Sequence, residues 1–127
     1  MFMISKIDNG NDARFLYDLV ATNSNTIIEP PNIPNQSSII NTIARYPFRS
    51  KIELSDGYYK IRIHPPHEEY TVFITTYGTH STRVMQQGDC NAPAGFQKML
   101  HNLFNDELGM YAYVYIDDIF SFSKTYN

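Results

Sequence analysis

Two adjacent aspartates, Asp117 and Asp118, interrupt an apolar, aromatic stretch that otherwise has the character of a buried strand. Taking two like charges out of water is costly, so the pair needs a turn that exposes it or a positive charge beside it. A third acid, Glu53, lies on the polar face of a separate predicted strand. Carboxylates that converge to about 4 Å repel by roughly 1 kcal/mol in water and about 4 kcal/mol at an effective dielectric of 20. Since Mg²⁺ prefers oxygen ligands, the three acids are a candidate metal site.

The aspartate pair also has a simpler interpretation, the solvated tip of a hairpin, because aspartate side chains hydrogen-bond their own backbone in turns. Two features weaken it: the pair has no glycine for a type I′ turn, and large apolar residues flank it closely. If the acids do bind metal, two ions about 3.5–4 Å apart are the arrangement that supports phosphoryl transfer. The residues alone leave both interpretations open.

The elements that must position these acids follow from the residue pattern. Short strands are predicted on both sides of the aspartate pair, the second of them ending near Ser123. The segment "RSKIEL" alternates polar and apolar residues and predicts the strand that carries Glu53. A helix is predicted from Pro93, with an apolar stripe from Phe96 to Leu108 and Gly109 just beyond its end.

The N-terminal half contains further short elements. Residues 3–7 and 13–19 predict a hairpin that carries Lys6 and Arg14. After a polar, proline-containing connection, "QSSIINTIAR" predicts a helix that places Ile39, Ile40, Ile43 and Ala44 on one face, with Asn35 or Ser37 as its N-cap.

The middle of the chain predicts a bend at Asp56-Gly57, a second apolar alternation, a turn at "HPPHEE" and a hairpin with Tyr77-Gly78 at its tip. The order is hairpin, helix, strand, hairpin, helix, hairpin. This order predicts an α+β fold with an antiparallel sheet packed on helices.

Composition limits the class of protein. At 127 residues and 43% hydrophobic content the chain forms at most one domain with a packed core. The net charge of −3 is unusual for a free-standing nucleic-acid binder. The four histidines lack zinc-ligand spacing with the single Cys90. Since no apolar run spans a bilayer and the N-terminus lacks signal-peptide features, we expect an intracellular protein.

Four ordered segments resemble motifs of reverse transcriptases. "YIDD", from Tyr115 to Asp118, resembles their Tyr-x-Asp-Asp motif, and "VMQQGDCNAPAGFQ" resembles their template- and nucleotide-contacting segment. "FRSKIELSDGYYKIRI" is similar to the segment with their first catalytic carboxylate, and "ISKIDNGNDARFLYDLVATNSNT" to their fingers hairpin. The residues of these segments are most similar to those of gypsy-type (metavirus) LTR retrotransposons.

The resemblance implies an RNA-directed DNA polymerase that adds deoxynucleotides to a primer 3′-hydroxyl. Its catalytic and metal-binding residues would be Glu53, Asp117 and Asp118, with the Leu54 backbone as a further candidate ligand. Its nucleotide-binding residues would be Lys6, Arg14, Asp56, Gly57, Tyr58 and Gln87. Its template- or primer-near residues would be Gly88, Pro93 and Tyr115. It implies two Mg²⁺ ions, replaceable by Mn²⁺, and as partners a dNTP and an RNA or DNA primer–template, with no membrane.

Several of these residues have an alternative interpretation from the sequence alone. Tyr58 would exclude a 2′-hydroxyl by its bulk, and is otherwise an ordinary core tyrosine after a turn. Lys6 and Arg14 would grip the triphosphate, and are otherwise two solvated cations on a hairpin. The stripe from Phe96 to Leu108 is interpreted as a packing face and not as a ligand contact.

The resemblance divides the chain into part of the fingers, residues 1–34, and the palm, residues 35–127, without the thumb, connection and RNase H parts of a polyprotein. The chain departs from the family pattern at Glu53, where the family has aspartate, and at Val20 and Lys60. A displacement of about 1 Å at a catalytic group can cost on the order of 100-fold in rate. The alternative function is therefore an inactive retroelement remnant that at most binds metal or a partner, and the enzyme assignment stays open.

Overall fold

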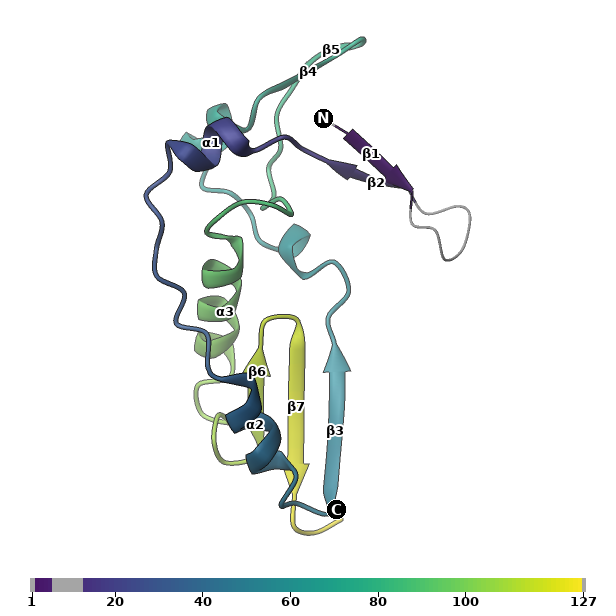
Figure 1. Cartoon of the computed structure of the whole chain (residues 1–127), viewed down its shortest axis with the longest axis vertical. Helices are drawn as coiled ribbons and strands as arrows, with labels where there is room; N and C mark the ends of the chain where they lie inside the picture. Colours follow the sequence, from purple (N-terminus) through teal and green to yellow (C-terminus); the bar gives the residue numbers. More distant parts are fainter. Residues whose placement is uncertain (1, 6–12, 127) are drawn as a thin grey trace. The chain divides into compact units, whose positions relative to one another are not determined.

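The computed structural model describes residues 2–5 and 13–126. Its compact units are discontinuous in sequence: residues 1–28 group with 58–92, and residues 29–57 group with 93–127. Helices and antiparallel strands together make up the predicted α+β architecture (Figure 1). The predicted division at residue 34 concerns functional parts of a polymerase and stays a prediction.

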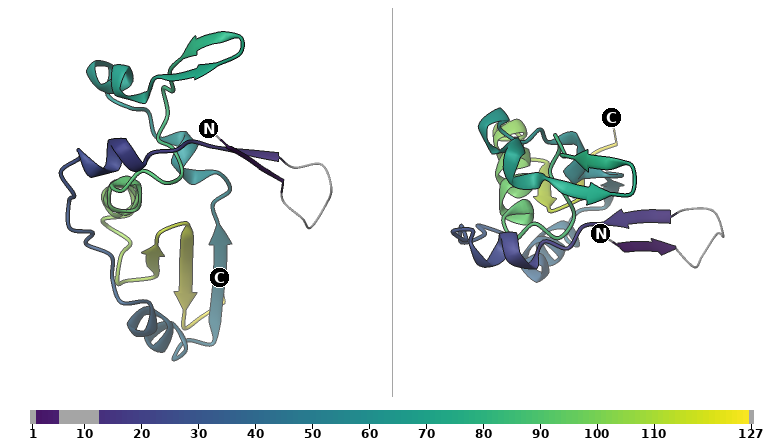
Figure 2. Two further views of the ribbon diagram at one scale, coloured as in Figure 1. Left: turned by 45° about the horizontal axis from the view of Figure 1, so that its top comes forward. Right: turned by 90° about the horizontal axis from the view of Figure 1, so that it is seen from above.

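A three-stranded antiparallel sheet, in the order β3-β7-β6, forms the centre of the second unit (Figures 1 and 2). Its strands are β3 (Phe48–Glu53), β6 (Ala112–Tyr115) and β7 (Asp118–Ser123). The central strand β7 pairs with β3 over six residue pairs, the last of them Glu53 with Asp118. On its other side it pairs with β6, where Tyr115 is opposite Asp118. The strands predicted around the aspartate pair and through "RSKIEL" are thus confirmed.

Helix α2 (Gln36–Ile43) covers one face of this sheet (Figure 1). The helix begins after Asn35, whose side-chain oxygen accepts a hydrogen bond from the Ser38 N–H at 3.1 Å. Asparagine is favoured at this position because it satisfies a backbone donor that the first turn leaves unpaired. The core beneath the helix consists of Ile39, Ile43 and Phe122, with Tyr46, Tyr113, Tyr115 and Phe120 packed around them.

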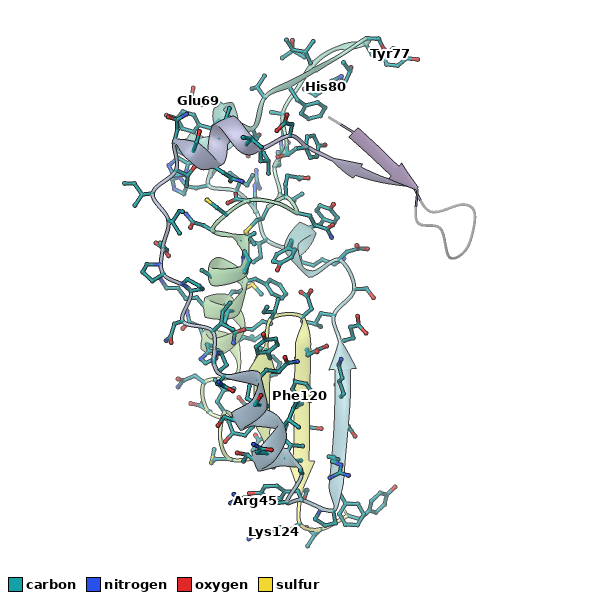
Figure 3. All side chains as sticks on the ribbon, viewed as in Figure 1. Arg45, Glu69, Tyr77, His80, Phe120 and Lys124 are labelled. Carbon is teal, nitrogen blue, oxygen red and sulfur yellow. The ribbon has the colours of Figure 1, made fainter. Side chains whose placement is uncertain are left out.

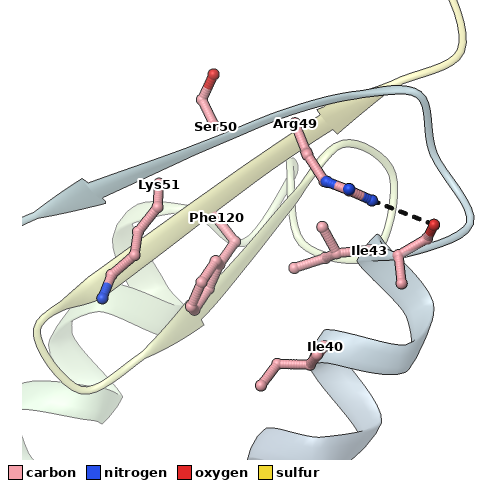
Figure 4. A pocket seen from close by; sticks show the side chains of 7 residues that line it. Ile40, Ile43, Arg49, Ser50, Lys51 and Phe120 are labelled. Atoms are coloured by element: carbon pink, nitrogen blue, oxygen red, sulfur yellow. Dashed lines mark hydrogen bonds between the residues drawn. The ribbon is translucent and has the colours of Figure 1, made fainter.

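A groove of about 430 Å³ remains between α2 and the sheet (Figure 4). The residues that line it are Ile40, Ile43, Ala44, Arg49, Ser50, Lys51 and Phe120. Ile40 was predicted on the buried face of the helix, but half of its surface is exposed beside this groove. Arg49 donates a hydrogen bond to the Ala44 carbonyl at 3.3 Å and so ties β3 to the end of α2.

Helix α3 (Ala92–Leu103) is shorter than predicted. Pro93 lies in its first turn as expected, and Phe96 and Leu100 are buried. The prediction that the helix runs on to Leu108 was wrong, because turns replace it after Leu103. The polar residues 105–107 favour turns, since asparagine and aspartate side chains compete for backbone hydrogen bonds. Gly109, predicted as the helix C′ residue, has φ +81° and donates to the Ala112 carbonyl at 3.0 Å, in the turn that leads into β6.

The first unit contains two hairpins and the short helix α1 (Val20–Ser24). Strands β1 (Phe2–Ser5) and β2 (Ala13–Leu16) pair antiparallel, which confirms the predicted hairpin, but β2 ends before residues 17–19, which were predicted to belong to it. Strands β4 (Phe73–Thr75) and β5 (Gly78–His80) form the other hairpin. Its tip is Thr76-Tyr77, one residue earlier than predicted, and Tyr77 is 94% exposed (Figure 3).

Two predictions in the middle of the chain were incomplete. The predicted apolar alternation after Gly57 begins with a 3-10 turn over residues 57–60, after which the Ile61 N–H donates to the Tyr58 carbonyl at 3.1 Å. A positive φ of 55° at Asp56 turns the chain before it can extend. The turn predicted at "HPPHEE" lengthens into a 3-10 helix, Pro65–Thr71, and α1 was not predicted. No helix among the described residues has the length and apolar character needed to cross a membrane.

Candidate active site

The predicted hairpin around the aspartate pair is confirmed, and its loop has only two residues. Because Tyr115 pairs with Asp118, the loop consists of Ile116 and Asp117. Ile116 has a positive φ of 50°. A β-branched residue in this conformation is a genuine outlier and costs of order 1–3 kcal/mol. Ile116 thus holds a strained backbone conformation that glycine or asparagine would adopt at lower cost.

The three predicted acids lie at the same end of the sheet. Glu53 is the last residue of β3 and lies directly opposite Asp118, the first residue of β7. One residue further on, the Leu54 N–H donates to the carbonyl of Asp117 at 2.8 Å. Like charges placed directly opposite each other on neighbouring strands destabilise a sheet. The fold therefore gathers negative charge at this end of the sheet.

Asp117 has an unusual electrostatic environment. Its Oδ1 atom is buried and has no hydrogen-bond partner. The pKa of Asp117 is raised, first by burial and then by the negative charges of Asp118 and Glu53. A buried carboxylate oxygen without a donor is costly, so this atom is suited to a cation.

Gly57 allows a close approach beside Asp117. A Cβ atom added at this buried glycine would lie 2.5 Å from Cζ of Phe96 and 3.2 Å from Oδ1 of Asp117. Only a residue without a side chain fits there. The predicted role of Gly57 in nucleotide binding stays a prediction, but its packing role is evident.

Lys51 supplies the positive charge that the sequence reasoning looked for but did not assign. Its Nζ atom lies 2.9 Å from Oδ2 of Asp118. The pKa of Lys51 is raised, chiefly by this hydrogen bond. Lys51 stands two residues before Glu53, and alternation along a strand places both side chains on the same face of the sheet. That spacing could have identified Lys51 from the sequence.

The donor set fits a magnesium ion that is completed by substrate. Among residues 2–5 and 13–126, no three His, Cys, Asp or Glu side chains are grouped closely enough to hold a metal ion by themselves. Mg²⁺ usually binds through one or two carboxylates plus substrate phosphates and not through a complete protein cage. The unpartnered Oδ1 of Asp117, with the carboxylate of Asp118 or Glu53, would supply one or two such ligands.

The other predicted site residues lie on several elements. Asp56 is exposed, Tyr58 and Gln87 are half-buried, Gly88 has φ +98°, and Pro93 lies in the first turn of α3. Arg14 lies on β2 opposite Ile4, and Lys6 is outside the described residues. The meeting of Tyr58 and Gln87 with the three acids stays a prediction.

Within its own unit, the loop that carries Gly88 is fixed by one side chain. Asn23 donates to the Gly88 carbonyl at 2.8 Å and accepts from the Cys90 N–H at 3.0 Å. Asn23 therefore holds the segment that follows Gln87, a role that the sequence reasoning missed.

A profile described as "Reverse transcriptase (RNA-dependent DNA polymerase)" matches residues 11–127. The chain belongs to the reverse transcriptase family. It is 29% identical, over 90% of its length, to the "Retrovirus-related Pol polyprotein from transposon opus" of Drosophila melanogaster, of which it covers 11%. It is 31% identical, over 84% of its length, to the "RNA-directed DNA polymerase homolog" of Oenothera berteroana, of which it covers 75%.

Solved reverse transcriptases share the fold. The foamy viral protease-reverse transcriptase in complex with an RNA/DNA hybrid matches 97% of the chain, with a TM-score of 0.81, 25% sequence identity and coverage of 16% of that protein. Relatives of similar identity come both from insect transposons and from plant viruses, so these similarities do not distinguish the gypsy type from other reverse transcriptases. The chain spans only a small part of most of these reverse-transcriptase relatives.

Proposed function

We propose that this chain is the fingers and palm part of an RNA-directed DNA polymerase from a gypsy-type retrotransposon polyprotein. The observation that carries the proposal is the register of Glu53 against Asp118, with the unpartnered Oδ1 of Asp117 one residue away. A cluster of acids that repel one another needs a cationic ligand to offset its cost. Template-directed nucleotidyl transfer is a reaction that uses such a cluster with bound metal ions.

In this proposal Glu53, Asp117 and Asp118 hold two Mg²⁺ ions, or Mn²⁺ in their place, and the Leu54 backbone is a further candidate ligand. The chemistry these ions supply when bound is activation of the primer 3′-hydroxyl and neutralisation of the leaving pyrophosphate. The residues of the chain contribute position and charge. The raised pKa of Asp117 means that this carboxyl binds metal only after it loses a proton it holds more tightly than usual.

The remaining residues have roles in substrate binding. Lys6 and Arg14 contact the triphosphate, and Asp56 and Gly57 offer backbone amides to it. Tyr58 limits the space beside the sugar of the incoming nucleotide. Gly88, Pro93 and Tyr115 lie near template or primer, and Gln87 faces the nucleotide. The partners are a primer–template, a dNTP and the rest of the polyprotein, in an intracellular particle or the nucleus.

Two observations favour a second candidate function, a remnant that binds without catalysing. Glu53 is one methylene longer than the aspartate of the family. In addition, Asp118 is paired with Lys51 in the structure, so a cation must compete for that carboxylate. This candidate retains metal or nucleic-acid binding and lacks chemistry.

Primer extension on an RNA template with Mg²⁺ tests the proposal. We expect extension by the 127-residue chain and its loss in Asp117→Asn. Asp106→Asn makes the same chemical change at an exposed turn and should leave extension intact. Binding of Mn²⁺ and primer–template without any extension, in this chain and in Glu53→Asp, would replace the polymerase with the binding-only function.

A further inference from the structure

The side chain of Gln97 on α3 is almost completely buried, with 2% of its surface exposed. Both ends of its amide are hydrogen-bonded to the backbone around the aspartate hairpin. Nε2 donates to the Val114 carbonyl at 3.0 Å, and Oε1 accepts from the Ile116 N–H at 2.7 Å. A buried amide that uses its donor and its acceptor in this way fixes the two backbone groups relative to each other.

These backbone groups have no strand to bond. Among the described strands β6 pairs only with β7, and its outer edge carries an isolated bridge between Ala112 and Leu108, so the edge at Val114 is left for Gln97. Gln97 occupies that edge with a side chain where another strand would otherwise be needed. The second of its bonds falls on Ile116, the residue with the positive φ. A strained conformation persists only where the surroundings hold it, and here the side chain of Gln97 does so.

The strain matters because Asp117 follows directly. The Oδ1 atom of Asp117 has no hydrogen bond of its own to orient it. Phe96, the neighbour of Gln97 on α3, fills the space beside Gly57, and any Cβ there would also crowd Oδ1 of Asp117. Two neighbouring residues of α3 thus border this site: Gln97 bonds the turn backbone, and Phe96 lies against Gly57, which is itself close to Oδ1 of Asp117.

We propose that Gln97 is a positioning residue for the metal site: its amide holds Ile116 in the left-handed conformation that aims Asp117 at the cation. The inference rests on the proposed function, since it assigns to Gln97 the orientation of a proposed ligand. Gln97 does not touch metal or substrate. It acts through Ile116, as outer residues do when they orient the ligands of a metal.

A pair of variants tests this in the full chain. Gln97→Met keeps the length of the side chain and removes both hydrogen bonds. We expect its Mn²⁺ affinity, measured by electron paramagnetic resonance, to fall about 10- to 100-fold, the range found for residues that support metal ligands. Gln86→Met is the matched control, because Gln86 is also buried and its Nε2 donates to the Val84 carbonyl. Mn²⁺ affinity should be unchanged in that control.

The Ile116→Gly variant separates positioning from a general structural role. Glycine adopts a positive φ without strain, so the turn no longer depends on Gln97. Adding Gln97→Met to Ile116→Gly should then weaken Mn²⁺ binding by less than about threefold, a non-additivity expected of residues in contact. Equal losses in both backgrounds, or no loss in Gln97→Met, would overturn the proposal.

Hydrogen exchange of the Ile116 amide keeps the proposal testable if Gln97→Met does not fold. In the unaltered chain this amide should exchange far more slowly than in an unstructured peptide. Exchange at the rate of an unstructured peptide refutes the contact with Gln97. If the unaltered chain does not bind Mn²⁺ but the amide is protected, the proposed metal function fails while the contact stands.

Discussion

Glu53 and Asp118 lie directly opposite each other at the end of the β3–β7 ladder, two acids in a position where a sheet usually places complementary residues. Lys51 compensates part of this charge by binding Asp118 at 2.9 Å, and Asp117 keeps a buried oxygen with no partner. The negative charge at this end of the sheet is therefore only partly compensated within the described residues.

Glu53→Asp should increase primer extension. The shorter side chain restores the carboxylate position typical of the family, and an error of about 1 Å at a catalytic group costs on the order of 100-fold in rate. We expect a gain of roughly 10- to 100-fold in the single-turnover rate with Mg²⁺. Glu53→Gln, which keeps the length and removes the charge, should abolish extension. A Glu53→Asp chain no faster than the unaltered one would show that side-chain length at this position does not limit the rate.

Lys51→Met should tighten metal binding. The ammonium group of Lys51 occupies Asp118 and competes with a cation for it. Its removal leaves three acids with less compensation, so we expect Mn²⁺ affinity to rise roughly three- to tenfold at low ionic strength, and less at high salt. Without metal the variant should unfold at a lower temperature than the unaltered chain. Thermal unfolding with and without Mn²⁺ measures both effects.

Lys124→Met is the control for that experiment, because it removes the same charge just beyond Ser123, at the opposite end of β7 from Asp118 (Figure 3). Mn²⁺ affinity should change little in this variant. If Lys51→Met weakens metal binding instead, Lys51 helps to hold Asp118 in its binding orientation and does not compete with the cation.

Asp117→Asn should stabilise the metal-free chain near neutral pH. The pKa of Asp117 is raised in the folded state above its ordinary value of 3.8. A raised carboxyl pKa gives stability that is fully present below the unfolded pKa and is lost as the pH rises through the folded pKa. The ionised Asp117 therefore weakens the fold at neutral pH, and asparagine removes that cost.

The difference in melting temperature between Asp117→Asn and the unaltered chain, measured in a chelator, tests this sign. We expect a gain of a few degrees near pH 7 that shrinks toward zero as the pH falls below about 4. Asp118→Asn should show the opposite sign near neutral pH, because it loses the ion pair with Lys51. A gain for Asp117→Asn that does not depend on pH would mean that ionisation is not its cause.

The sequence was sufficient for features that depend on neighbouring residues. The turn at the aspartate pair and the strand that carries Glu53 follow from local patterns and are confirmed. Of the two N-cap candidates, Asn35 and Ser37, the structure has Asn35. The early end of α3 at Leu103 and the 3-10 turn at Gly57 were not predicted, because the apolar stripe continues past the polar residues 105–107 and the local pattern does not indicate the positive φ at Asp56. A polar residue inside an apolar helix, such as Gln97, also gives no local sign of what it binds.

The same limit applies to the site. The pairing of Lys51 with Asp118 joins residues 67 positions apart, and only the register of β3 against β7 brings them together. Alternation along "KIEL" put Lys51 and Glu53 on one face, so the positive partner was present in the pattern without being assigned. The sequence therefore predicted which acids belong to the site. Which of them is neutralised by a lysine could be seen only from the register of β3 against β7.

Gly57→Ala should destabilise the chain through a clash that a second glycine does not have. The added methyl group would lie 2.5 Å from Cζ of Phe96, closer than real Cβ contacts allow, so the ring must move. Overpacking of this kind typically costs about 1–3 kcal/mol in the free energy of unfolding.

Gly95→Ala is the matched control: Gly95 lies within α3, and an added Cβ meets nothing within 4 Å. Alanine there should stabilise the helix by about 0.5–1 kcal/mol. Urea unfolding of both variants gives the comparison. Because the added methyl group would also lie 3.2 Å from Oδ1 of Asp117, the Gly57→Ala chain should lose Mn²⁺ affinity, whereas the Gly95→Ala chain should retain it. Equal stability of the two variants would contradict the close approach at Gly57.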